Sequence, residues 1–305
     1  MKDYKVMDEI IRVDEIHQYN QLMSVETLHP LVGMIDFSKI EPIRNSRKLY
    51  GFYAVFLKGV CGEIKYGRSR YDYQDGTMLF VAPGQVMGAA DNGEFFQPTG
   101  HLLMFHPDLL HGTPLGKMIK DYTFFSYESN EALHLSEKER NIILNSFDQI
   151  RSELTHPIDK HSKPLLVDNI KLLLDYCTRF YDRQFISRET VNKDVLVRLE
   201  NLLNDYFTSD KPEKAGVPTV QFCADELNLS ANYLSDLIRK ETGSTALKLI
   251  HARLIEEAKY IISTTDRNVS EIAYGLGFQY PQHFTRFFKQ NVGCTPNEYR
   301  IQITM

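Results

Sequence analysis

The C-terminal third of the chain repeats itself, and this internal repeat constrains the fold more than any other feature. Residues 222–243 read FCADELNLSANYLSDLIRKETG, and residues 271–293 read EIAYGLGFQYPQHFTRFFKQNVG. The aligned pairs keep their chemical character: Ala224 with Ala273, Leu227 with Leu276, Leu229 with Phe278, Leu234 with Phe284, Leu237 and Ile238 with Phe287 and Phe288, Arg239 with Lys289, and Gly243 with Gly293. A period of about 50 residues is typical of structural repeats, but two copies indicate a pair of modules rather than an array.

The first copy predicts two short helices joined by a tight turn. We expect one helix from about Thr219 to Asn228, because asparagine tolerates the left-handed conformation that such a turn requires. Ser230 is a good N-cap for the next helix, which would end at Gly243. That helix would bury Leu234, Leu237 and Ile238, and its outward face would carry Ala231, Asn232, Ser235, Asp236 and Arg239.

The second copy follows the same plan. Ser270 is expected to cap its first helix, and Gly277 to form the turn. Pro281 would occupy the first position of the next helix, where its missing N–H costs nothing. The expected buried residues are Ile272, Ala273, Leu276, Phe284, Phe287 and Phe288, and the expected outward residues are Gln282, His283, Thr285, Arg286 and Lys289.

The segment between the copies predicts a rigid spacer. Residues 245–263, TALKLIHARLIEEAKYIIS, have the periodicity of one continuous helix. About 18 residues at ~1.5 Å per residue give a rod of about 27 Å. Helix–turn–helix modules place a helix in the major groove of DNA, and such a spacer would set two of them about one duplex turn, ~34 Å, apart on one DNA face.

These segments resemble a known family. The stretches LSANYLSDLIRKETG, IAYGLGF, HFTRFFK and GCTPNEYR, within residues 217–301, are similar to the DNA-binding domain of AraC/XylS transcription regulators. The resemblance implies double-stranded DNA at a promoter or operator as the partner, and recruitment of RNA polymerase there. By position it implies base contacts from Asn232, Ser235, Asp236, Gln282, His283 and Arg286, and phosphate contacts from Arg239, Tyr280 and Lys289.

The chemistry of these residues predicts that the two modules contribute unequally. Arg286 can pair bidentately with guanine and Gln282 with adenine, each worth about 1–3 kcal/mol of discrimination. Asp236 can only accept a hydrogen bond from cytosine or repel a phosphate. We therefore expect the second module to anchor binding and the first to tune it.

Charge alone does not indicate a nucleic-acid partner. The formal net charge is −5, and residues 211–305 contain 11 Lys and Arg against 10 Asp and Glu. This balance lacks the strongly basic footprint of a non-specific binder. Affinity for DNA must then come from a few placed cations and base contacts.

The N-terminal part predicts a different architecture. Residues 20–110 carry β-rich runs at 49–57, 62–67, 76–83 and 101–106, broken by Asp75-Gly76, Pro83-Gly84 and Asn92-Gly93. This spacing favours a small antiparallel barrel or sandwich. The segment GTMLFVAPGQVM resembles the cupin-like sensor barrel of many AraC/XylS members. The predicted fold class is therefore α+β, an N-terminal antiparallel, cupin-like β-barrel over residues 1–130 followed by helices.

Helical periodicity begins after the barrel. Ser136, with Glu139 three residues later, predicts a capped helix that ends at His156-Pro157, and a second amphipathic helix begins near Ser162. This hairpin either mediates dimerisation or only covers the barrel. With a third helix at 192–207, it forms a predicted connector over residues 131–207. A polar linker is expected at 208–218, and an all-α DNA-binding domain at 219–305.

No catalytic or cofactor site is expected. His101, His106 and His111 are five residues apart, so neighbouring histidines in a strand would face opposite ways and could not share a metal. P-loop, G-x-G-x-x-G and G-x-S-x-G motifs are absent. The pairs Phe95-Phe96 and Phe124-Phe125 are candidates to line an apolar ligand pocket, although core packing is the more common role of barrel aromatics. No ligand-binding residue is assigned.

The remaining features predict a cytoplasmic protein without a membrane partner. No apolar run approaches the ~18 residues of a membrane span, and the N-terminal MKDYKVMDEI lacks a signal-peptide core. Cys61, Cys177, Cys223 and Cys294 are far apart and read as small apolar residues of a reducing compartment.

Three functional interpretations follow. The first is a DNA-binding regulator, a homodimer, whose N-terminal domain senses a small-molecule effector or a protein signal. The second is a regulator whose barrel only dimerises. The third is a cupin-type metal-dependent enzyme fused to a DNA-binding module. We favour a non-enzymatic regulator of the AraC type.

Overall fold

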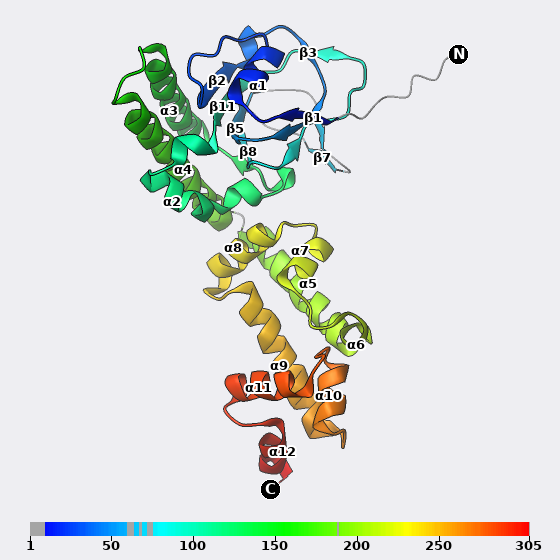
Figure 1. Ribbon diagram of the computed structural model, residues 1–305. Helices are drawn as coiled ribbons and strands as arrows, with labels where there is room; N and C mark the ends of the chain where they lie inside the picture. The colour runs from blue at the N-terminus through cyan, green and yellow to red at the C-terminus, as the bar shows by residue number, and fades with distance from the viewer. Residues whose placement is uncertain (1–9, 60–63, 67–68, 72–75, 188, 305) are drawn as a thin grey trace, which may run out of the picture. The chain divides into compact units, whose positions relative to one another are not determined.

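The computed structural model describes residues 10–59, 64–66, 69–71, 76–187 and 189–304 (Figure 1). The chain divides into two compact units, which we describe separately: an N-terminal unit, Met1–Ile186, and a C-terminal unit, Ser187–Met305. Cys61, Asp75 and most of the N-terminal decapeptide lie outside the described residues.

A five-stranded antiparallel sheet forms the centre of the N-terminal unit. Its order is β12 (Leu133–His134), β8 (Thr77–Val81), β5 (Tyr53–Lys58), β11 (Gly100–Phe105) and β2 (Val32–Asp36). The strand β8 is buried along its whole length, and successive side chains point to opposite faces. Both faces of the sheet are therefore covered.

Each face of this sheet has its own apolar partner. On one face, Ala54, Phe56, Leu102 and Met104 join a core cluster with Ile16 and others from α1 (Ile16–Leu22). On the other, Met78 contacts Cys177 of α4 (Ser162–Ser187) with the sulfur atoms 3.9 Å apart. The sheet thus lies between a small β layer and a helical layer.

The small β layer is where the predicted barrel differs from the structure. The strand β4 (Arg47–Tyr50) pairs with β9 (Val86–Met87) antiparallel and with β1 (Ile10–Val13) in parallel. Two further two-stranded sheets are β3 with β10 (Ile43–Arg44, Phe95–Phe96) and β6 with β7 (Ile64–Tyr66, Ser69–Tyr71). The pairings among the described residues do not close a ring, so a closed cupin-like barrel is not confirmed, and the expectation of purely antiparallel pairing is wrong.

The predicted strand at 49–57 is two strands, β4 and β5, separated at Gly51. The Gly51 N–H donates to the carbonyl of Val13 at 2.8 Å, which brings the backbones together. A Cβ at this position would lie 2.6 Å from the Cα of Asp14. Only glycine allows this approach, so the chain breaks its strand there to meet β1.

The helical hairpin of the N-terminal unit has the predicted ends. The helix α3 (Glu137–Thr155) begins with the predicted capping box: the Ser136 N–H donates to Glu139 at 2.8 Å, and the Glu139 N–H donates to Ser136 Oγ at 3.4 Å. The helix α4 begins at Ser162 as expected. Leu165, near the start of α4, lies outside the core, with 46% of the residue exposed. Shorter helices are α2 (Pro114–Met118) and the 3₁₀ turns Phe37–Lys39, Pro107–Leu110, Ile119–Asp121, Thr123–Ser126 and Ser129–Glu131.

The C-terminal unit is all-α. Its helices are α5 (Glu189–Thr208), α6 (Lys211–Ala215), α7 (Val220–Leu227), α8 (Ala231–Thr242), α9 (Ala246–Thr264), α10 (Val269–Gly275), α11 (Pro281–Val292) and α12 (Pro296–Thr304). No helix in the described part of the chain combines the length and apolar character needed to span a membrane.

The helix α5, which the sequence grouped with the connector, packs within the C-terminal unit. It contacts α7, α8 and α9 and buries Leu199, Leu203 and Tyr206. Its fully buried Asn192 donates to the Glu241 carboxylate on α8 at 2.8 Å. The division between the two compact units therefore falls before α5, after Ile186.

The segment predicted as a linker, 208–218, contains α6 and packs against the second module. The hydroxyl of Tyr206 donates to the Gly216 carbonyl at 2.9 Å. A Cβ added at Gly277, which has φ +91°, would lie 2.5 Å from the Gly216 carbonyl carbon. Two glycines thus meet backbone to backbone where α6 reaches the turn of the second module.

This contact predicts that Gly277→Ala destabilises the C-terminal unit by at least about 1–3 kcal/mol, through backbone strain and the clash with Gly216. The matched control is Gly275→Ala, a helical position with open space around it, which should stabilise by about 0.5–1 kcal/mol. Urea unfolding of both variants measures the difference. Equal stabilities would show that the two segments do not meet.

Candidate nucleic-acid interface

The first helix–turn–helix module, α7 with α8, forms as the local sequence predicts. The hydroxyl of Thr219 accepts a bond from the Phe222 N–H at 3.1 Å, and that of Ser230 accepts one from Tyr233 at 3.2 Å. Asn228 adopts the left-handed conformation between the helices, with φ 58° and ψ 45°. Gly243 ends α8 in the same region, with φ 68°. Ala224 is fully buried in the module.

The second module, α10 with α11, has one cap different from the predicted one. Asn268, not Ser270, caps α10: its side chain accepts from the Glu271 N–H at 2.9 Å, and Glu271 accepts from the Asn268 N–H at 2.8 Å. This reciprocal pair satisfies two free N–H groups, which a serine inside the helix cannot do. Gly277 forms the turn, and Pro281 is the first residue of α11, as predicted.

Each second helix presents one outward face. The positions 232, 235, 236 and 239 of α8, and 282, 285, 286 and 289 of α11, repeat at three- and four-residue steps and so share a face. Most of the predicted contact residues are exposed: Asn232, Arg239, Tyr280, Gln282, His283, Arg286 and Lys289. Ser235 and Asp236 are only half-buried.

Some polar side chains on the two faces already bond to partners within the protein. The hydroxyl of Ser235 donates to the carbonyl of Ala231 at 2.7 Å, and Asp236 also has a partner within the protein. On α11, Thr285 donates to the Pro281 carbonyl at 3.0 Å. Arg286 makes no ion pair with any residue that the structure describes. Arg239 of α8 is likewise exposed and without an ion pair among the described residues, so both faces carry an available cation.

Aromatic residues shape the α11 face. Phe284 and Phe288 are fully buried as predicted, but Phe287 is only half-buried. Its ring meets that of His251 on α9 edge-on, with centroids 4.9 Å apart. The rings of Tyr280 and His283 lie 5.3 Å apart at the start of α11. Both residues of this pair are exposed.

The spacer α9 forms as predicted, and other helices bond to its middle and to the chain just after its C-terminus. Its 19 residues at ~1.5 Å each give about 28 Å. Arg253 in its middle bonds to Asn204 of α5 at 2.5 Å and to Glu257 at 3.0 Å. Near its C-terminus, Arg300 of α12 donates to the Arg267 carbonyl at 2.7 Å. These contacts come from outside the repeated segments.

The N-terminal histidines do not come together. His101 is half-buried on β11, while His106 caps the turn Pro107–Leu110 by accepting from the Asp108 N–H at 3.2 Å. His111 ends that turn and is exposed. Among the residues that the structure describes, no group of three or more histidine, cysteine or acidic side chains is placed to hold a metal ion.

The two phenylalanine pairs have different roles. Phe124 and Phe125 are buried core residues, and the Phe124 ring stacks at 5.5 Å on Tyr181 of α4. Phe96 lines a cavity in the N-terminal unit, whereas Phe95 is 69% exposed with the Arg44 guanidinium 5.9 Å from its ring. One of the two pairs therefore contributes to a pocket.

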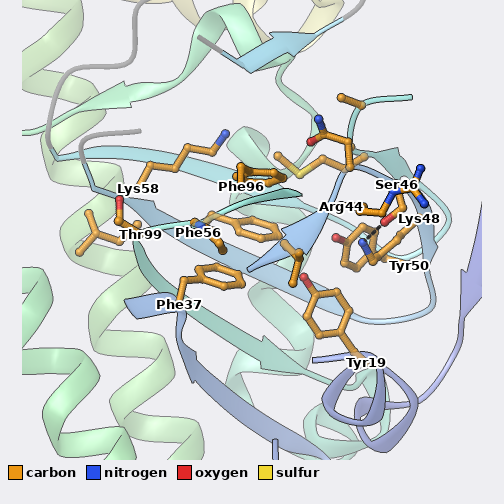
Figure 2. A pocket seen from close by; sticks show the side chains of 17 residues that line it. Tyr19, Phe37, Arg44, Ser46, Lys48, Tyr50, Phe56, Lys58, Phe96 and Thr99 are labelled. Atoms are coloured by element: carbon orange, nitrogen blue, oxygen red, sulfur yellow. Dashed lines mark hydrogen bonds between the residues drawn. The ribbon is translucent and has the colours of Figure 1, made fainter. Parts of the chain in front are cut away.

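The cavity beside Phe96 has about 120 Å³ of space (Figure 2). In Figure 2 the rings of Phe37 and Phe56 lie between Thr99 and Lys58 on one side and Tyr50, Ser46 and Lys48 on the other. The buried lysine Lys48 is a polar residue that sequence reasoning missed. In the run RKLY it reads as a solvent-facing cation, and no local signal distinguishes it from its neighbour Arg47.

Comparison with known proteins places these modules in a family. A model described as a helix-turn-helix domain matches residues 223–302. The transposon Tn10 TetD protein of Escherichia coli is 34% identical over 145 residues, which are 47% of this chain and 91% of TetD. The uncharacterised HTH-type transcriptional regulator YdiP of Escherichia coli (strain K12) is 25% identical over 121 residues, 40% of this chain.

The chain spans about a third, 36%, of the length of YdiP. Among solved structures, an AraC-type regulator from Chromobacterium violaceum is 18% identical over 38% of this chain and 97% of its own, with a TM-score of 0.33. The assignment rests on the sequence matches and on the capped modules described above. The chain belongs to the AraC/XylS family of transcription regulators.

Proposed function

We propose that the protein is a sequence-specific DNA-binding transcription regulator, and that α8 and α11 enter successive major grooves on one face of promoter or operator DNA. The observation that carries this proposal is the pair of capped modules with exposed polar faces, joined by the 19-residue helix α9. A spacer of about 28 Å is close to the ~34 Å between successive major grooves.

In this proposal the second module supplies most of the specificity. Arg286 and Gln282 are exposed and can form bidentate bonds with guanine and adenine, and His283 lies next to them. Asn232, Ser235 and Asp236 would contact bases from the first module. Arg239, Tyr280 and Lys289 would lie near phosphates. The engaged state of Ser235 and Asp236 supports a smaller contribution from α8.

The proposed ranking predicts that Arg286→Ala weakens operator binding by about 5- to 150-fold, because a bidentate guanine contact is lost. Asp236→Ala should change affinity less, since its carboxylate either accepts one bond or repels a phosphate. The control Lys138→Ala removes an exposed cation from α3 and should leave affinity unchanged. Fluorescence anisotropy on a mapped operator measures all three. A larger loss from Asp236→Ala would reverse the ranking.

We further propose that the N-terminal unit forms a homodimer through an exposed stripe on α4. Leu165 and Leu172 are 46% and 45% exposed and lie seven residues apart on this helix. Asn169 and Tyr176 continue the stripe at the alternating three- and four-residue steps of a two-helix seam. A second copy of the same helix would cover this stripe.

The dimer proposal predicts that Leu165→Glu with Leu172→Glu gives a monomer, because two buried charges oppose association. The control Thr178→Glu adds the same charge at an exposed position off the stripe. Sedimentation velocity at micromolar concentration measures the outcome. A wild-type chain that sediments as a monomer, or a double variant that stays dimeric, would reject this interface.

The regulatory mechanism we propose is a one-component switch. A small-molecule effector bound in the N-terminal unit would alter the packing on α3 and α4. The chain passes from α4, ending at Ser187, to α5, beginning at Glu189, and α5 packs on both α8 and α9. A change at the end of α4 would thus reach the DNA-binding modules and, at a promoter, the recruitment of RNA polymerase.

A further inference from the structure

We propose that the cavity beside Phe96 binds a small organic carboxylate with an apolar body, and that Lys48 pairs with its carboxylate group. This inference rests on the proposed sensing role of the N-terminal unit and names the chemical class of the sensed molecule. It is carried by a buried cation in an apolar cavity, with which no carboxylate of the described residues pairs.

The first observation is the state of Lys48. Lys48 is only 7% exposed, and its ammonium donates to Ser46 Oγ at 2.5 Å. The centroid of the Tyr19 ring lies 5.8 Å from the Lys48 Nζ. No carboxylate in the described part of the chain pairs with it. Burial lowers the pKa of Lys48 to about 8, so the amine is still largely protonated at neutral pH. A buried ammonium without a counter-charge is unfavourable, and an anion would relieve this.

The second observation is the charge of the other lining residues. Arg44, at the edge of the cavity, is already paired with Asp91 at 2.9 Å, and Lys58 also has a partner within the protein. Burial raises the pKa of Tyr19 to about 12, so its hydroxyl is neutral. No aspartate or glutamate is among the described residues that line the cavity. The site therefore matches a single negative charge.

The third observation is the apolar character and size of the space. Phe37 and Phe56 lie with their ring planes 2° apart and their centroids at 6.4 Å, and Tyr50 meets Phe56 edge-on at 6.4 Å. Met87 and Pro98 complete this wall. The volume of about 120 Å³ is close to the roughly 150 Å³ that accommodates benzene. The apolar body is thus about the size of one ring or a short alkyl chain.

The test uses the full-length protein with benzoate, phenylacetate and hexanoate as carboxylate probes. Benzyl alcohol and benzylamine are the neutral and cationic counterparts of benzoate. We expect the carboxylates to raise the melting temperature of the wild-type protein and to bind in calorimetry at millimolar concentration or below, since a ligand that binds the native state stabilises it. The neutral and cationic counterparts should bind more weakly or not at all.

The decisive variant is Lys48→Met, which keeps the length of the side chain and removes its charge. We expect carboxylate affinity to fall by about 10- to 100-fold, because a bond to a charged group is lost. The melting temperature without ligand should rise, since the uncompensated charge is gone, and this rise shows that the variant folds. The control Lys117→Met removes an exposed lysine of α2 and should change neither value.

The proposal is overturned if no carboxylate binds the wild-type protein, or if Lys48→Met binds the carboxylate as tightly as the wild type does. The operator affinity of Arg286→Ala is measured separately, so failure here leaves the DNA-binding proposal intact. A neutral ligand that binds equally well with and without Lys48 would preserve the sensing role and reject the carboxylate class.

Discussion

The burial of one face of α5 is the interaction on which the C-terminal unit depends. Neither two-helix module has enough apolar surface for a core of its own. Leu199, Leu203, Tyr206 and Phe207 of α5 supply the missing surface, each contributing about 1.5–3 kcal/mol when buried. Because α5 contacts α7, α8 and α9 together, it joins the first module to the spacer, and α6 extends this support to the second module.

Local backbone rules explain why much of the repeated region could be predicted. Asn228, Ser230, Gly243 and Pro281 act through their own conformations or through bonds to N–H groups two or three residues away, and all four have the predicted role. The prediction that Ser270 caps α10 was wrong, also for a local reason. The pair Asn268 and Glu271 has the spacing of a capping box, which outweighs a lone serine.

Features that depend on distant partners could not be predicted in the same way. The predicted runs locate β4, β5, β6, β8 and β11, whereas the other strands of the N-terminal unit, β2 of the central sheet among them, were not predicted. The parallel pairing of β1 with β4 depends on a backbone contact between Gly51 and Val13. The amphipathic pattern of α5 showed that it has an apolar face without showing what covers it. The outward faces of α8 and α11 followed from helical spacing, whereas the half-burial of Phe287 and Asp236 depends on neighbouring packing.

The position of α5 has a practical consequence for dissecting the protein. The family resemblance begins near residue 217, which invites a fragment cut there. Such a fragment would lack α5 and so expose the apolar sides of α7 and α9 that α5, including its Tyr206, covers. Exposed apolar patches of this kind favour aggregation. A soluble DNA-binding fragment would instead have to start at about Ser187, where the compact unit begins.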